Sequence, residues 1–211
     1  MSDLFSFESL WENRYSSDEY IFGKEPNDFL RERVRDLPPG PVLCIADGEG
    51  RNSVFVAQNG HEVTSVDLTV VGPAKTRHLA DERGVTVNTI TADLEEFDLG
   101  LEKWSAVVSI FAHVPYDLRV DLHRRVVAAL KPGGVLLLEA YTPEQVGRGT
   151  GGPPIPEMTM SLKGLRSELA PLEFIHGAEL EREVIEGAGH TGVGCVVQVI
   201  AIKATEDRGP K

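Results

Sequence analysis

The sequence lacks an excess of positive charge and long apolar runs. Its 21 Lys and Arg residues are outnumbered by 33 Asp and Glu residues, which gives a formal net charge of −12 at pH 7. An acidic surface repels phosphate backbones and anionic lipids, so we expect neither nucleic acid nor a membrane as a partner. No apolar run reaches the ~18 residues of a membrane span. Residues 1–15 also lack the basic segment and apolar stretch of a signal peptide, which predicts a cytoplasmic location.

Cysteine is scarce as well. Cys44 and Cys195 each lie in an apolar, strand-like run, without CxxC or HxxxH spacing nearby. A thiol in such a run usually acts as a small buried hydrophobe, so we expect no disulfide and no metal site. A length of 211 residues suits a single domain with one well-developed core. We expect a monomer or a weak homodimer.

Short apolar runs alternate with amphipathic segments from residue 26 to residue 141, a pattern typical of βα units around a parallel sheet. The predicted strands are 42–46, 61–67, 85–91, 106–111 and 135–141, and the predicted helices are 26–36, 52–59, 71–83 and 118–130. This order predicts a Rossmann-like, doubly wound α/β sheet with helices on both faces.

The pattern changes after Tyr141. Residues 147–154 are rich in Gly and Pro and predict a mobile loop, followed by a short helix at 161–169. Two strands, 174–185 and 194–203, are joined by a turn too short for a crossover helix, so they should pair antiparallel and complete a seven-stranded, mostly parallel sheet. We expect the tail, 205–211, to be frayed.

Three elements at successive strand ends predict an adenosine site. Gly48 and Gly50 follow the first strand, where glycines let the backbone approach a ligand. Asp67 ends the second strand, 19 residues beyond Gly48, where a carboxylate can accept hydrogen bonds from both hydroxyls of a ribose. Asp93 follows the third strand and can reach the amine of an adenine. Taken alone, the glycines indicate only a tight turn and each Asp a helix cap, but their order indicates a nucleoside.

Two classes of cofactor contain adenosine. A dinucleotide loop requires a small residue at the sixth position of GxGxxG, where this chain has Ser53, preceded by Arg51 and Asn52. This substitution and the antiparallel last strands disfavour an NAD(P)-dependent oxidoreductase, which remains an alternative.

At this point the chain resembles the class I S-adenosylmethionine-dependent methyltransferases. The resemblance covers nearly the whole chain and rests on Asp47, Gly48 and Gly50, on Asp67, on Asp93 with Leu94, on the turn 130–134 and on the reversed last strand. The chain departs from the family at Cys44 and Ala46, where most members carry an acid and a glycine. We therefore expect the loop conformation to differ.

Segments 11–15, 20–27 and 109–115 resemble the tellurite-resistance and thiopurine branch of small-molecule methyltransferases. The resemblance implies that N-terminal aromatic residues fold over the cofactor, so that 1–37 form a lid and helix, 42–141 the core, and 142–204 the loop, helix and strand pair. Arg51 either contacts the cofactor carboxylate or only begins a helix. The resemblance places these residues at the cofactor: Asp47, Gly48, Gly50, Arg51, Asp67, Leu68, Asp93, Leu94, Ser109, Ile110, Tyr20 and Phe22.

The resemblance also implies in-line methyl transfer to a small-molecule acceptor. A thiol, a metalloid oxyanion or a similar soft nucleophile needs little acid–base help, whereas a hydroxyl needs a general base. Tyr15, His113 and Tyr141 are predicted to line the acceptor pocket, with no catalytic role assigned. The 147–154 loop either closes over the acceptor or is a plain solvent loop. A non-catalytic module that binds S-adenosylmethionine is the second alternative.

Overall fold

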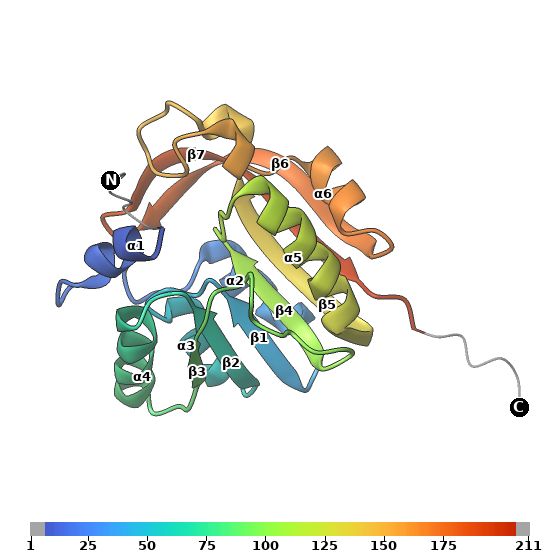
Figure 1. Cartoon of the computed structure of the whole chain (residues 1–211), viewed down its shortest axis with the longest axis horizontal. Coiled ribbons are helices and arrows are strands. Elements are labelled where there is room, and N and C mark those ends of the chain that lie inside the picture. Colours follow the sequence, from blue (N-terminus) through green and yellow to red (C-terminus); the bar gives the residue numbers. More distant parts are fainter. Residues whose placement is uncertain (1–6, 206–211) are drawn as a thin grey trace, which may run out of the picture.

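The computed structural model describes residues 7–205 and contains one seven-stranded sheet in the order β3-β2-β1-β4-β5-β7-β6 (Figure 1). Strands β1 to β5 are parallel, and β7 pairs antiparallel with both β5 and β6. The strands are β1 (Pro41–Ile45), β2 (Glu62–Asp67), β3 (Asn88–Thr91), β4 (Trp104–Ile110), β5 (Leu130–Tyr141), β6 (Glu173–Glu186) and β7 (His190–Ile202). This topology confirms the predicted Rossmann-like sheet with a reversed last strand.

Helices cover both faces of the sheet because its strands alternate between two hydrophobic clusters. Leu43 and Ile45 of β1 pack with the cluster under α5 and α6, while Val42 and Cys44 pack with the cluster under α2, α3 and α4. Figure 1 shows α5 lying across β4 and β5. The helices are α1 (Phe7–Tyr15), α2 (Asp28–Arg33), α3 (Arg51–Gln58), α4 (Val71–Arg83), α5 (Tyr116–Ala129) and α6 (Leu162–Glu168), with 3-10 turns at Val34–Asp36, Pro143–Gln145 and Pro156–Met158.

Three predicted strand boundaries were wrong. β3 begins at Asn88, because the N–H of Val85 is used to close the end of α4 on the carbonyl of Ala80. β5 begins at Leu130 and runs through the predicted turn 131–134, because residues 133 and 134 continue the ladder with Lys203. β7 begins at His190, since only residues 187–189 form the turn. Residues 1–6, and 206–211 of the predicted tail, lie outside the described residues.

The β6–β7 hairpin is longer than the strand beside it. Pairing of β5 with β7 stops at Tyr141 and Val196, whereas β6 and β7 stay paired as far as Glu186 and His190. The end of the hairpin therefore projects past the carboxyl end of β5, towards α1 (Figure 1). There the N–H of Gly189 donates to the carbonyl of Ile21 at 3.0 Å. Two segments far apart in sequence thus meet beside the edge where α/β sheets bind ligands.

Candidate functional site

The loop between β1 and α3 bends through three residues in the left-handed region. Their φ angles are +47° at Ala46, +61° at Gly48 and +88° at Gly50. Gly50 begins α3, and a Cβ there would lie 2.5 Å from the side chain of Thr76 on α4. Ala46 thus adopts the backbone conformation that favours glycine, at the position where it departs from the family pattern.

Asp67 holds this loop in place. Its Oδ2 accepts the N–H of Gly48 at 2.8 Å, and its Oδ1 accepts the N–H and the hydroxyl of Thr69 at 3.0 and 2.7 Å. A carboxylate has about four acceptor sites, so Oδ2 retains one for a ligand. At least one acceptor site of the carboxylate is therefore not used by these three bonds.

Asp47 faces the protein instead of the ligand side of the loop. Its Oδ2 accepts the hydroxyl of Ser65 on β2 at 2.8 Å, and its Oδ1 accepts the N–H of Ser53 on α3 at 3.3 Å. Burial raises the pKa of this carboxyl. Both oxygens join the loop to neighbouring elements, so the side chain positions Gly48 and has no bond directed to a cofactor.

Helix α1 lies across the loops that follow β1 and β2. Tyr15 is 5% exposed, and a Cβ on Gly48 would lie 2.7 Å from its Oη. Burial, followed by the charge of Asp67, raises the pKa of Tyr15 well above its ordinary value. Oε2 of Glu12 accepts the N–H of Val70, just beyond Asp67, at 3.0 Å. Tyr15 therefore lies at the glycine loop, with the cofactor residues, and apart from the predicted acceptor residues.

Glu49, inside the glycine loop, fastens the segment after α1. Its Oε2 accepts the N–H of Ile21 at 2.9 Å, and its Oε1 forms an ion pair with Nζ of Lys75 at 2.7 Å. Tyr20 donates its hydroxyl to the carbonyl of Lys75, and its ring lies between the ammonium groups of Lys24 and Lys75. The sequence prediction missed Glu49; an acid between two loop glycines was the available signal.

Arg51, the first residue of α3, forms a buried ion pair with Glu186 of β6, with Nη2 and Oε2 2.5 Å apart. Oε1 of Glu186 also accepts from Asn27 at 2.9 Å and from Arg182 at 3.0 Å, and Arg182 continues to Glu139 of β5. Burial alone would raise the pKa of Glu186, but these donors hold it well below its ordinary value. Arg51 thus begins the helix and anchors the hairpin.

His113 is held by both ring nitrogens. Nδ1 lies 2.8 Å from the carbonyl of Met158, and the N–H of Tyr141 donates to Nε2 at 3.1 Å. This pattern requires a neutral ring with its proton on Nδ1. Burial lowers the pKa of His113 to about 4. The residue joins the loop after β4 to the end of β5, and neither nitrogen is free to take a proton from a ligand.

Five rings gather where β4 and β5 end, and we call them the aromatic cluster: Phe22, Phe111, His113, Tyr141 and His190. Phe111 has a φ of +51° and stacks on Tyr141 at 4.5 Å between ring centroids. His190 lies edge-on to both, at 4.8 and 5.3 Å, and Phe22 lies 4.6 Å from it. Among the described residues, three side-chain atoms are buried without a hydrogen-bond partner: Oη of Tyr141 and Nδ1 of His190 in this cluster, and Nε2 of His176 elsewhere on β6.

The 147–154 loop lies against this cluster. A Cβ on Gly151 would lie 2.7 Å from Cδ2 of His190 and 3.3 Å from Oη of Tyr141. Gln145 fastens the loop, because its Nε2 donates to the carbonyl of Gly151 and its Oε1 accepts the N–H of Cys195, each at 2.9 Å. The glycine at 151 is what allows the loop to approach the two rings so closely.

The remaining predicted residues lie along the same edge of the sheet. Asp93 is exposed and caps the N–H of Glu95 at 2.9 Å. A hollow of about 390 Å³ lies between Glu95, in the loop after β3, and the start of α5, and Asp93 is not among the residues that line it. Leu68 is half-buried, and the other predicted residues here are buried: Leu94, Ser109 and Ile110.

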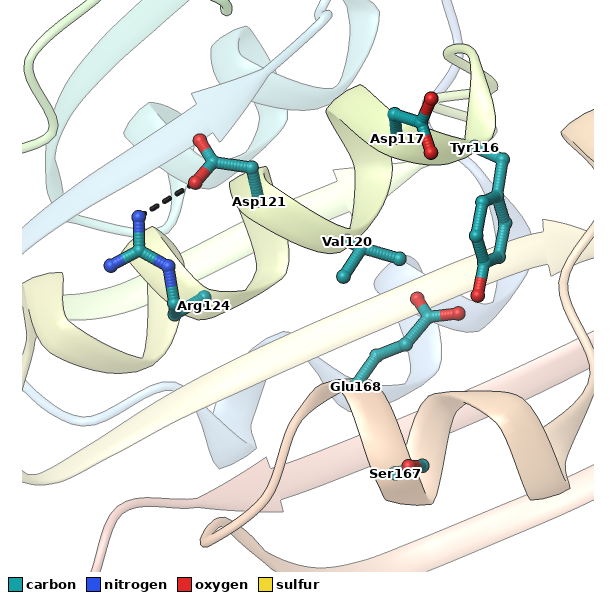
Figure 2. Close-up of a pocket in the computed structure, with 7 residues that line it drawn as sticks. All are labelled: Tyr116, Asp117, Val120, Asp121, Arg124, Ser167 and Glu168. Atoms are coloured by element: carbon teal, nitrogen blue, oxygen red, sulfur yellow. Dashed lines mark hydrogen bonds and ion pairs between the residues drawn. The ribbon is translucent and has the colours of Figure 1, made fainter.

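A second hollow, of about 480 Å³, lies between α5 and α6 (Figure 2). Figure 2 shows Tyr116 and Glu168 at one end and the Asp121–Arg124 ion pair at the other. Glu168 is held by Arg119 at 3.0 Å and by His123 at 2.7 Å. None of the predicted site residues lines this hollow, so we do not assign it to the site.

Other kinds of site find little support in the described part of the chain. Cys44 and Cys195 are free thiols. Between residues 7 and 205, no three His, Cys, Asp or Glu side chains are grouped so that they could hold a metal ion. Within the same range, every helix is too short or too polar to cross a membrane.

Comparisons with known proteins agree with this geometry. Residues 42–134 match the family described as "Methyltransferase domain". The ubiquinone biosynthesis O-methyltransferase of Histophilus somni is 30% identical over 115 residues, which are 51% of this chain and 48% of that enzyme. The corresponding enzyme of Actinobacillus pleuropneumoniae is 28% identical over 116 residues. The chain thus spans about half the length of the curated relatives it matches.

Solved structures share the fold over most of the chain. TehB from Haemophilus influenzae superposes with a TM-score of 0.68 and 18% identity, covering 93% of this chain and 66% of that one. A protein solved in a study of the conversion of a disulfide bond into a thioacetal group during echinomycin biosynthesis superposes with a TM-score of 0.75, also at 18% identity, covering 96% and 94%.

The order of the sheet, the glycine loop and Asp67 give an α/β domain with a reversed last strand. Residues 42–134 thus match a methyltransferase domain, in agreement with the resemblance of the sequence to the class I S-adenosylmethionine-dependent methyltransferases. S-adenosylmethionine is the cofactor of this class.

Proposed function

We propose that the protein transfers the methyl group of S-adenosylmethionine to a small-molecule acceptor. The observation that carries the proposal is the hydrogen bond from the N–H of Gly48 to Asp67. It fixes the glycine loop at a strand end in a conformation that a ligand can approach closely. Oδ2 of Asp67 retains one acceptor site for a ribose hydroxyl, and exposed Asp93 can meet the adenine amine. Residues at this edge therefore fit the cofactor.

The cofactor, when bound, supplies a methyl group already activated by a sulfonium. The chain's own work is to align the acceptor and to exclude water. Tyr15 and the segment after it lie over the glycine loop, fastened by Glu49. The aromatic cluster lies beside them at the ends of β4 and β5, and we assign the cofactor to the first region and the acceptor to the second.

The surroundings of the aromatic cluster support a small acceptor. Tyr141 is fully buried, and the 147–154 loop packs directly on it and on His190. Soft nucleophiles, such as thiols and metalloid oxyanions, would fit such a site without a base. The names of the curated relatives instead suggest oxygen as the methylated atom.

Titration calorimetry with S-adenosylmethionine and S-adenosylhomocysteine tests the proposal. Both should bind, and Asp67→Ala should weaken binding by about 1–3 kcal/mol, the loss expected for a hydrogen bond to a charged group. Asp81→Ala, an exposed acid on α4, is the matched control and should bind like the wild type. Failure of both compounds to bind at millimolar concentration would overturn the proposal.

Binding alone does not separate an enzyme from a module that only binds the cofactor. Formation of S-adenosylhomocysteine in the presence of thiols, metalloid oxyanions and phenols makes that distinction. Bound NAD(P)H fluorescence would instead favour an oxidoreductase. Ser53 argues against that alternative, since it is fully buried with its N–H on Asp47, at the position where a dinucleotide loop needs Gly or Ala.

A further inference from the structure

We propose that His190, oriented by Glu186, is the general base for a hydroxyl acceptor, and that Tyr141 binds the same acceptor through its phenol group. This assignment rests on the proposed methyltransferase function and adds the acceptor class and the residues that serve it. Neither residue was given a catalytic role by the sequence.

The first support is the state of His190. The residue is 8% exposed, yet among the described residues neither of its ring nitrogens has a hydrogen-bond partner within 3.5 Å. His113, by contrast, has both nitrogens engaged. Its charged neighbour is Glu186, so the ring is desolvated beside a carboxylate without a hydrogen bond in return.

The second support is the place of Glu186. Its Oε2 lies 3.8 Å from Nδ1 of His190. The two residues face each other across the turn of the hairpin, at the paired ends of β6 and β7. That distance is beyond a hydrogen bond but close enough to stabilise an imidazolium and to favour the tautomer with its proton on Nδ1. Nε2 is then left to accept a proton, in the arrangement by which a carboxylate orients a catalytic histidine.

The third support is the second unpartnered group. Oη of Tyr141 is buried next to His190, and both residues face Gly151 of the 147–154 loop. A phenol donor and an imidazole acceptor, flanked by Phe111 and Phe22, suit a planar aromatic compound that carries adjacent hydroxyl groups. One hydroxyl would accept from Tyr141 while the other donates to His190.

The charges around His190 favour a neutral ring ready to accept a proton. Burial lowers its pKa; Glu186 of β6 acts in the opposite direction, and Arg51 of α3 and Arg182 of β6 add to the lowering. The transfer balances as follows. The acceptor O–H proton goes to Nε2, the oxygen electron pair forms the O–CH₃ bond, the S–CH₃ bond of the cofactor breaks, and the proton then passes to solvent.

Catechol and 4-nitrocatechol test this assignment, because they share a shape while the nitro compound ionises near neutral pH. With His190→Gln, kcat on catechol should fall by roughly 10²–10⁴-fold, the usual contribution of a general base. The loss should be much smaller on 4-nitrocatechol, and the affinity for S-adenosylmethionine should not change. The control is His176→Gln on the same hairpin, whose ring lies against Phe29 and should affect neither probe.

A second measurement does not depend on turnover. The absorbance of 4-nitrocatechol reports its ionisation, and the wild-type protein, with or without S-adenosylhomocysteine, should bind it as the anion at a pH where the free compound is neutral. His190→Gln should lose this ionisation. Tyr141→Phe should raise the dissociation constant of the probe and the KM for catechol more than it lowers kcat.

Several results would overturn the assignment. These are equal losses on both probes with His190→Gln, methylation of 2-mercaptoethanol but of neither catechol, or neither methylation nor binding of the catechols by a protein that binds S-adenosylhomocysteine. Each of these leaves the proposed function standing, whereas failure to bind S-adenosylhomocysteine removes the proposed function itself.

Discussion

Glu49 accepts the backbone N–H of Ile21 at 2.9 Å, so a side chain of the glycine loop holds the N-terminal segment in place. Because Lys75 binds the other oxygen of the same carboxylate, this one residue joins three segments of the chain. The N-terminal segment is therefore held over the glycine loop by a residue of that loop. A ligand that moves Glu49 should also move the backbone at Ile21.

Replacement of Glu49 by Ala should release that segment. The amide of Ile21 should then exchange its hydrogen faster, and S-adenosylmethionine should bind more weakly, since about 1–3 kcal/mol is lost when a buried charged partner is removed. Hydrogen exchange and calorimetry measure the two effects. Glu19→Ala, an exposed acid in the same segment, should change neither. Unaltered exchange at Ile21 in Glu49→Ala would show that other contacts hold the segment.

Tryptophan fluorescence should report cofactor binding through one residue. Trp11 lies 5.5 Å from Tyr15 and 6.2 Å from Phe22, whereas the other tryptophan, Trp104, is buried at the far end of β4. We expect S-adenosylhomocysteine to change the emission of the wild type and of Trp104→Phe, but not of Trp11→Phe. A signal that survives in Trp11→Phe would place the ligand away from α1.

Replacement by glycine should lower the free energy of unfolding less at Ala46 than at an ordinary alanine. A left-handed backbone costs an L-residue roughly 1–2 kcal/mol, which offsets the chain entropy that glycine loses on folding. In urea unfolding, Ala46→Gly should leave the free energy unchanged or raise it by up to about 1 kcal/mol. Ala57→Gly, inside α3, should lower it by about 1 kcal/mol. An equal decrease in the free energy of unfolding at both positions would contradict the strain at Ala46.

Glu186 should stabilise the chain at neutral pH and lose that effect in acid. Its pKa is lowered in the folded state, so its contribution is complete above its unfolded pKa of about 4.3 and disappears as the pH falls below that value. Glu186→Gln should cost about 3–5 kcal/mol near pH 7, because Arg51 loses its buried partner, and less below about pH 4. Urea midpoints across this range measure the difference.

The exposed neighbour Glu183 provides the control for that series. Glu183→Gln removes a carboxylate from the same strand without touching Arg51 or Arg182, and should change the free energy of unfolding little at any pH. A difference between wild type and Glu186→Gln that stays constant with pH would show that the carboxylate does not titrate as its partners indicate.

The parallel core was predictable because its signals are local. Strands β1 and β2 each follow a local break, at Gly40 and at Gly60, and predicted helix 71–83 matches α4 at both ends. Errors in the strands arose where a tertiary partner decides the boundary, as at Lys203, which extends the ladder of β5 beyond the local turn signal of 131–134.

The acceptor side was harder to predict because its residues meet only after folding. His190 stands in a glycine-rich turn that by itself indicates a hairpin, and its relation to Tyr141 depends on how far β7 runs beyond β5. For His113, the position after a strand predicted a pocket-lining residue, but its two backbone partners could not be predicted from the sequence. Periodicity records burial and carries no information on such long-range pairing.

The projecting end of the β6–β7 hairpin bears on how acceptor preference can evolve in the proposed function. Beyond Val196, the ladder of β7 continues with β6 alone, while the N–H of Gly189 donates to the carbonyl of Ile21 and so keeps the hairpin end in contact with the N-terminal segment. In the proposed function, the hairpin end serves the methyl acceptor and the bond between Gly48 and Asp67 lies on the side of the methyl donor. Substitutions at the hairpin that keep the contact between Gly189 and Ile21 should therefore change the choice of acceptor more than the recognition of the donor.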